Sequence, residues 1–150
     1  MTVTHLVPLT EAEVRQLAAD WYRKLDVHAP LEEYFPLLTE ENLEMRFPEG
    51  TVYGFDGFQG WYERVTCVFF DEVHTLKKVE RTSNADGQVQ VKVVVGWQAS
   101  IWNPPAAKSE RIVLDAYQTW AVKRSPKTQK AVISLYVVDS FDYAQGSYKL

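Results

Sequence analysis

Apolar residues in the first part of the chain recur with helical spacing. Thr10 precedes Glu13 by three residues, a capping-box pattern that predicts the start of a helix. The apolar stripe of this helix follows at intervals of three or four residues: Val14, Leu17, Ala18, Trp21 and Leu25. Pro30 ends this helix or begins the next element, and residues 31–38 predict a short second helix broken near Pro36.

The middle of the chain predicts a short strand and then a third helix. Leu43, Met45 and Phe47 alternate with polar residues, as in a strand with one buried face. After a turn at 48–50, Asp56 is a candidate N-cap, with Gln59 three residues further on. The apolar side of this helix carries Phe58, Trp61, Tyr62, Val65 and Phe69.

The second half of the chain has the alternation of β-strands. Residues 73–81 predict a strand of mixed character, and 84–87 give a strong turn signal. Strands over 89–102, 111–123 and 131–138 follow. One face of the strand predicted over 89–102 is apolar throughout: Val89, Val91, Val93, Val95, Trp97, Ala99 and Ile101. Helices first and strands last predict an α+β fold with an antiparallel sheet.

Size and charge narrow the possibilities further. The 150 residues predict a single domain with its core at about 10–142. A net charge of −4 without a long basic run argues against nucleic acid as a partner. We expect a cytoplasmic protein that does not enter the membrane. The start of the chain lacks the pattern of a signal peptide, and no stretch approaches the roughly 20 apolar residues of a membrane span. The single cysteine, Cys67, excludes an intramolecular disulfide and fits a reducing compartment.

Three segments resemble the nuclear transport factor two-like superfamily, which includes SnoaL-like cyclases, ketosteroid isomerase and scytalone dehydratase. They are the early helix with Trp21-Tyr22 and the following 37–41, the segment 45–50 with Gly54 leading into 56–58, and the closing strand 132–138 ending at Asp139. The resemblance implies a cone-shaped, antiparallel or mixed sheet that curls around the N-terminal helices. It also implies a pocket at the open end of the cone for a small apolar or aromatic molecule. The fold hosts many activities, so it does not settle the function.

Enzymes of this type pair a carboxylate or histidine base with hydrogen-bond donors inside an apolar cavity, which suits proton transfer. His74 is the first candidate, with an exposed rim position as the alternative. Asp139 is the second, because it ends a strand face that is apolar up to that point. Its alternative role is to cap loop amides. Asp115 is the third. Simple alternation places Asp115 on the outer face of its strand, and only a bulge would turn it inward.

Aromatic and amide side chains are candidates for the pocket wall. The set comprises Tyr22, Tyr53, Trp61, Trp97, Gln118 and Trp120. Ordinary core packing is the alternative for each aromatic residue. The sequence has no Gly-rich phosphate loop, no Cys-x-x-Cys and no His-Glu-x-x-His, so we expect neither a metal nor a cofactor.

Two functions remain open at this level. The chain is either an isomerase, dehydratase or cyclase that uses acid–base chemistry, or a domain that binds a hydrophobic molecule or serves as a dimeric scaffold without turnover. Tyr117, Val113 and Trp102 on the outer face of the sheet predict a homodimer. Relatives commonly pair through the sheet, so the resemblance implies the same.

Overall fold

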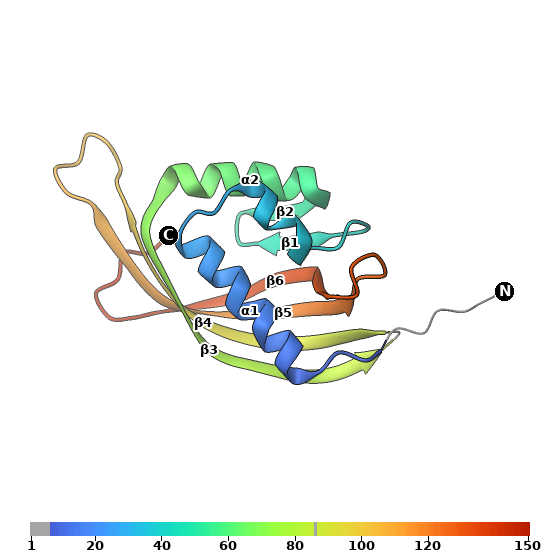
Figure 1. The fold of residues 1–150 in the computed structure, drawn as a ribbon. Helices are drawn as coiled ribbons and strands as arrows, with labels where there is room; N and C mark the ends of the chain where they lie inside the picture. Colours follow the sequence, from blue (N-terminus) through green and yellow to red (C-terminus); the bar gives the residue numbers. More distant parts are fainter. Residues whose placement is uncertain (1–6, 86) are drawn as a thin grey trace.

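Two α-helices lie against the inner face of a curved six-stranded sheet in the computed structural model, which describes residues 7–85 and 87–150 (Figure 1). Helix α1 spans Glu11–Asp26 and α2 spans Gly54–Val68. Short 3₁₀ helices at Leu31–Glu33 and Phe35–Leu37 replace the predicted second helix. Asp86 of the predicted turn lies outside the described residues, as does His5.

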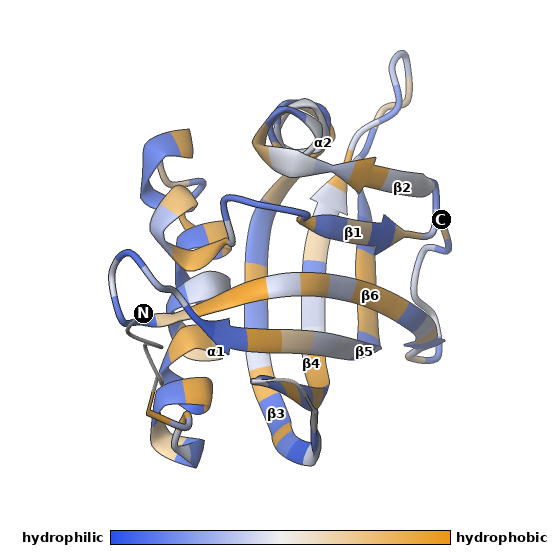
Figure 2. Cartoon of the chain, turned by 90° about the vertical axis from the view of Figure 1, so that its right-hand side faces the viewer, coloured by the Kyte–Doolittle hydropathy of each residue, from blue (hydrophilic) through white to orange (hydrophobic). Residues whose placement is uncertain are grey.

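The sheet has the strand order β2-β1-β6-β5-β4-β3. Its strands are β1 (Glu44–Phe47), β2 (Gly50–Tyr53), β3 (Phe69–Ala85), β4 (Gln88–Ile101), β5 (Glu110–Arg124) and β6 (Ala131–Tyr143). Neighbours are antiparallel except β1 and β6, which run parallel, so the sheet is mixed. The predicted α+β class with helices packed in the concavity of the sheet is confirmed (Figure 2).

Helix α1 forms as its sequence pattern predicts. The Thr10 hydroxyl accepts a hydrogen bond from the Glu13 backbone N–H at 3.1 Å, and the Glu13 carboxylate accepts one from the Thr10 N–H at 3.0 Å. The apolar stripe is buried against the sheet, with Trp21 fully enclosed between Tyr34, Phe58 and Tyr136. Strand β3 makes most of the sheet contacts with this helix.

Helix α2 begins earlier than predicted. The sequence pattern does not predict strand β2, which connects the 48–50 turn directly to the helix at Gly54. Asp56 therefore lies in the first turn and does not cap it, although its charge still suits the positive end of the helix dipole. Gly57 lets the helix approach β2, because a Cβ there would lie 3.0 Å from Val52 Cβ.

Bulges in β3 and β6 set which side chains face the helices. The pairing of β3 with β4 shifts after Phe70, after Leu76 and after Arg81, which explains why this strand has a mixed pattern. In β6 the register skips Ser134 and again Asp139. Each skipped residue reverses the alternation, so the inner face of β6 changes along the strand.

No helix among the described residues is both long and apolar enough to cross a membrane.

An ion pair ties α1 to the end of β5. The Arg124 guanidinium donates to both carboxylate oxygens of Glu13 at 2.8 Å, and its own side chain is 11% exposed. Together with the Thr10 N–H, this bidentate bond lowers the pKa of the Glu13 carboxyl from 4.5 to about 2.

A lowered pKa in the folded state means that the ionised Glu13 stabilises the fold above pH 4.5. This stabilisation is lost as the pH falls toward 2. We predict that Glu13→Gln narrows the difference in melting temperature between pH 6 and pH 3, measured by circular dichroism. Exchanging exposed Glu63 for Gln is the control. An unchanged difference in Glu13→Gln would contradict this assignment.

Candidate functional site

A cavity of about 620 Å³ lies between the inner face of the sheet, the end of α1 and one side of α2. Most of its wall is apolar, and includes Leu25, Phe47, Val65, Phe69, Val95, Ala116, Val138 and Phe141. The polar side chains that reach it include Tyr62, Glu72, His74, Gln118 and Tyr136. A cavity of this size and composition suits a small hydrophobic ligand held by a few polar contacts.

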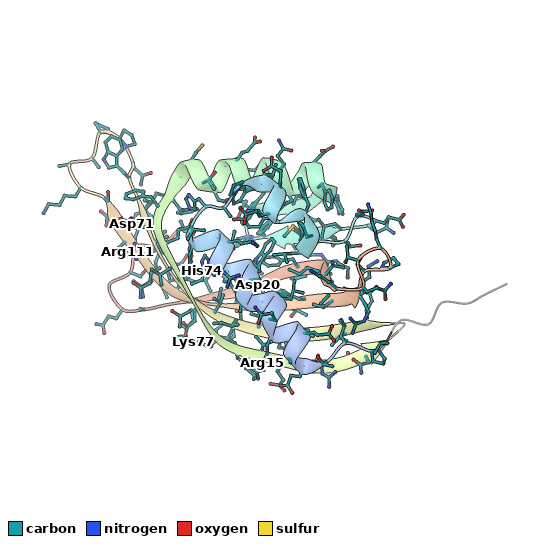
Figure 3. All side chains as sticks on the ribbon, viewed as in Figure 1. Arg15, Asp20, Asp71, His74, Lys77 and Arg111 are labelled. Atoms are coloured by element: carbon teal, nitrogen blue, oxygen red, sulfur yellow. The ribbon has the colours of Figure 1, made fainter. Side chains whose placement is uncertain are left out.

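His74, which lines the cavity, forms a half-buried pair with Asp26. His74 Nδ1 lies 2.6 Å from Asp26 Oδ1, and the same oxygen accepts the His74 backbone N–H at 2.8 Å. The His74 side chain is only 9% exposed, and it lies between α1 and the sheet (Figure 3). Two hydrogen bonds to one oxygen hold the imidazole in a single orientation.

The partner of Nδ1 decides the chemistry of His74. A carboxylate only accepts hydrogen bonds, so the proton of a neutral His74 ring resides on Nδ1. Nε2 then carries a lone pair, and no hydrogen bond to it is present among the described residues. The ring lines the cavity. This arrangement is that of a general base whose positive charge, once it accepts a proton, is stabilised by Asp26.

Gln118 supplies a hydrogen-bond donor to the same cavity. Its Oε1 accepts from the Trp120 indole at 2.9 Å and from the Tyr22 hydroxyl at 2.8 Å. Indole Nε1–H can only donate, so the atom it meets is the amide oxygen and the NH₂ group is the other end. Because Gln118 lines the cavity, its NH₂ group is available to a ligand carbonyl.

Tyr22 links this donor to the base. Its ring stacks on the His74 ring with centroids 5.0 Å apart, while its hydroxyl holds the Gln118 amide. Burial raises the pKa of Tyr22 well above its usual value, so the hydroxyl remains a donor. Both polar groups therefore depend on one buried ring of α1.

The carboxylate of Glu72 also lines the cavity. Glu72 accepts the Trp97 indole N–H at 3.0 Å through Oε1, and its Oε2 contacts His28 Nε2. Its side chain is 10% exposed. On the α2 side, the Tyr62 hydroxyl donates to the Ala29 carbonyl at 2.6 Å. Burial first, and the nearby Glu72 charge in addition, raise the pKa of Tyr62.

Only some of the residues predicted for the pocket wall line the cavity. Trp61, Trp97 and Gln118 line the cavity as expected. Tyr22 and Trp120 lie directly behind the lining and hold Gln118 in place. Tyr53 is 67% exposed at the end of β2 and lies away from the cavity, because β2 ends there and its side chain turns outward.

The expectation that Asp139 reaches the pocket mouth is not met. The bulge at Ser134 reverses the alternation of β6, so Tyr136 and Val138 face the cavity in place of Leu135 and Val137. Asp139 lies in the second bulge and is exposed on the outer face. There its carboxylate accepts a hydrogen bond from the Thr119 hydroxyl at 2.7 Å.

Asp115 also lies outside the cavity. No bulge shifts β5 against β4, so the simple alternation holds and the side chain points outward. Lys77, the extra residue of a bulge in β3, pairs with it at 2.7 Å. Asp115 is therefore an outer-face residue, as simple alternation predicts. Its partner Lys77 is labelled in Figure 3.

Asp26, Glu72 and His28 are absent from the sequence-based predictions. They share one sequence feature whose meaning depends on the fold: an acid stands two residues before a histidine both at Asp26–His28 and at Glu72–His74. The described residues contain no group of three or more His, Cys, Asp or Glu side chains able to hold a metal ion.

The chain is similar to known proteins in its three-dimensional structure, but no similarity is found at the level of sequence. No protein-family model and no curated protein sequence matches the chain. Hexachlorocyclohexane dehydrochlorinase LinA-type3 from Novosphingobium barchaimii LL02 superimposes with a TM-score of 0.72 at 15% identity, covering 93% of this chain and 92% of that one. ActVI-ORFA from Streptomyces coelicolor gives 0.66 at 15% identity, covering 85% and 94%.

An uncharacterised protein with a cystatin-like fold from Caulobacter vibrioides gives a TM-score of 0.67 at 11% identity, covering 90% of this chain and 89% of that one. At such identities the likeness concerns the fold. The resemblance expected from the sequence is confirmed at the level of the fold: this chain shares the cystatin-like α+β fold of these structural neighbours.

Proposed function

We propose that this protein is a cofactor-independent enzyme that moves a proton on a small hydrophobic ring ketone, with His74 as the general base. The observation that supports the proposal is the His74–Asp26 pair, fixed by two hydrogen bonds and facing an apolar cavity. Beside an apolar wall, hydrogen bonds to developing charge are stronger than in bulk solution.

The proposed reaction begins at a carbon next to the carbonyl group. His74 Nε2 removes a proton from this carbon, and the electron pair of the C–H bond moves toward the carbonyl to form an enolate. The Gln118 NH₂ group donates to the enolate oxygen, and Asp26 stabilises the imidazolium. The proton then returns to a different carbon, which is isomerisation, or to a leaving hydroxyl, which is elimination of water.

The structural neighbours agree with this class of chemistry. LinA-type3 is named for the loss of hydrogen chloride from hexachlorocyclohexane, a reaction that also breaks a C–H bond. The competing function is binding without turnover. Two features favour it. The cavity wall is largely apolar, and both hydrogen bonds to Gln118 Oε1 come from within the protein.

We predict that the protein accelerates deuterium exchange at C1 of 2-tetralone, a bicyclic ketone, in D₂O followed by NMR. His74→Gln lowers the exchange rate by about 10²-fold or more, because it removes the base. Asp26→Asn also lowers the rate, because it no longer selects the Nδ1–H tautomer.

Asp139→Asn is the matched control and retains wild-type exchange, since Asp139 lies on the outer face. Binding of 2-tetralone without acceleration, or equal rates in wild type and His74→Gln, would refute the catalytic function and favour the binding function.

We also propose that two copies pair through the outer face of the sheet. Val73, Tyr117 and Phe70 are 46%, 42% and 41% exposed on this side, and Trp102 at the β4–β5 loop is 51% exposed. Val113 lies beside them at the register position opposite Gln98. Apolar side chains gathered on one face in this way are typical of an interface.

The pairing predicts a dimer in sedimentation at micromolar concentration. Tyr117→Arg shifts the equilibrium toward monomer, because a buried unpaired charge opposes association. Exchange of the solvent-exposed Thr51 for Arg is the control, since it lies on the distant strand β2. A monomeric wild-type protein would exclude the proposed interface.

A further inference from the structure

Glu72 is an acid of the cavity wall to which the proposed reaction gives no role. It belongs to a three-residue pattern that occurs twice, an acid followed by valine and histidine, in Asp26-Val27-His28 and in Glu72-Val73-His74. The two copies pair crosswise, Asp26 with His74 and Glu72 with His28. Whereas Asp26 acts on the cavity only through His74, Glu72 lines the cavity itself.

The carboxylate of Glu72 has more capacity for hydrogen bonds than the protein fills. Its Oε2 faces His28 Nε2, and its Oε1 accepts the Trp97 indole N–H at 3.0 Å. A carboxylate offers about four acceptor positions, and no third donor to it is present among residues 7–85 and 87–150. Trp97 lines the cavity, so Oε1 is the oxygen on the cavity side. The Glu72 side chain is only 10% exposed.

The register of the sheet places Glu72 and Gln118 at opposite ends of the cavity floor. Gln118 lies opposite Val93 of β4, and Trp97, which binds Glu72, lies four residues further along the same strand. Four residues of extended strand span about 13 Å. The floor between the two ends is apolar and includes Val95 and Ala116.

The His74 ring lies between these two ends. Its centroid is 6.3 Å from that of Trp97 at the Glu72 end, and 5.0 Å from that of Tyr22, which holds Gln118 at the other end. A ring ketone with its oxygen at Gln118 and its acidic carbon at His74 therefore extends its far ring toward Glu72.

We infer that Glu72 selects fused-ring ketones that carry a hydroxyl group on the ring far from the carbonyl. The inference rests on the proposed function, which sets the carbonyl at Gln118. A ligand that fills the cavity displaces water that would otherwise solvate the carboxylate, and an apolar ring cannot replace those hydrogen bonds. A hydroxyl replaces them with a charge-assisted bond. A hydroxyl is favoured over an ammonium group because a neutral donor loses less hydration energy beside an apolar wall.

Glu49 provides a matched comparison in the same cavity wall. Its Oε1 accepts the Trp61 indole N–H at 3.1 Å, just as Glu72 accepts that of Trp97. Glu49 also lines the cavity, but it is exposed, so solvent still hydrates its carboxylate when a ligand is bound. Glu49→Gln therefore alters the same kind of indole–carboxylate bond without altering a half-buried acceptor.

The selection is measured by calorimetric titration with naphthols that differ only at the far ring. We predict that wild type binds naphthalene-2,6-diol about tenfold or more tightly than 6-methoxy-2-naphthol or 2-naphthol, which have no donor at that position. In Glu72→Gln this ratio falls to about threefold or less, because a neutral amide oxygen replaces the carboxylate. Glu49→Gln retains the wild-type ratio.

A merely structural role of Glu72 gives a different result. Misplacement of Trp97 or His28 would weaken the binding of all three naphthols alike and leave the ratio unchanged. That outcome in Glu72→Gln would overturn the inference. The comparison within wild type needs no variant, and equal affinities for the three naphthols there would also overturn it. Tighter binding of 6-aminomethyl-2-naphthol than of the diol would contradict the preference for a hydroxyl.

Turnover separates this inference from the proposed function. We predict that 6-hydroxy-2-tetralone exchanges deuterium with a lower KM than 2-tetralone and a similar kcat, because the far hydroxyl is bound equally in ground and transition states. Glu72→Gln raises the KM of the hydroxylated ketone toward that of 2-tetralone. If wild type exchanges neither ketone, the proposed function fails, and the naphthol titrations still decide whether Glu72 selects a hydroxyl. If both ketones exchange with the same KM, the selection fails and the proposed function stands.

Discussion

The hydrogen bonds between Asp26 and His74 join the last residue of α1 to the start of β3 across 48 positions of sequence. They serve the fold and the site together. The helix end is held against the strand, and the same contact fixes the orientation of the imidazole that lines the cavity. Tyr22, one helical turn earlier, stacks on that imidazole and holds the Gln118 amide. The positions of the polar side chains His74 and Gln118 in the cavity therefore depend on how α1 packs on the sheet.

Periodicity predicts the elements of the fold because each has one strongly apolar face. The α1 stripe and the inner faces of β4 and β5 are buried as their patterns indicate, down to Gln118 in an otherwise apolar row. Strand β2 is missed because it has no buried face: none of its four side chains is buried, so its sequence shows no alternation. Bulges are missed for a related reason: an extra residue at Ser134 is visible only through pairing with β5, yet it turns Asp139 away from the cavity.

The candidate site is predictable only in part for the same physical reason. His74 is identifiable as a titratable residue at the start of a strand, but its direction depends on the bulge beside it. Asp26 is an ordinary acid at a helix end until the fold brings it to His74. Pairing of side chains far apart in sequence is a property of tertiary structure, so neither Asp26 nor Glu72 stands out from local patterns. The repeated acid–valine–histidine pattern becomes meaningful once the crosswise pairing is known.

The central claim is that His74, held by Asp26, presents its free nitrogen to a ligand in the apolar cavity. A crystal structure with 2-naphthol, a flat analogue of a ring enol, tests this most directly. The account predicts the naphthol hydroxyl within hydrogen-bonding distance of Gln118 Nε2, the adjacent ring carbon facing His74 Nε2, and an intact bond from His74 Nδ1 to Asp26. Naphthol bound elsewhere, or a His74 ring turned out of the cavity, would contradict the account.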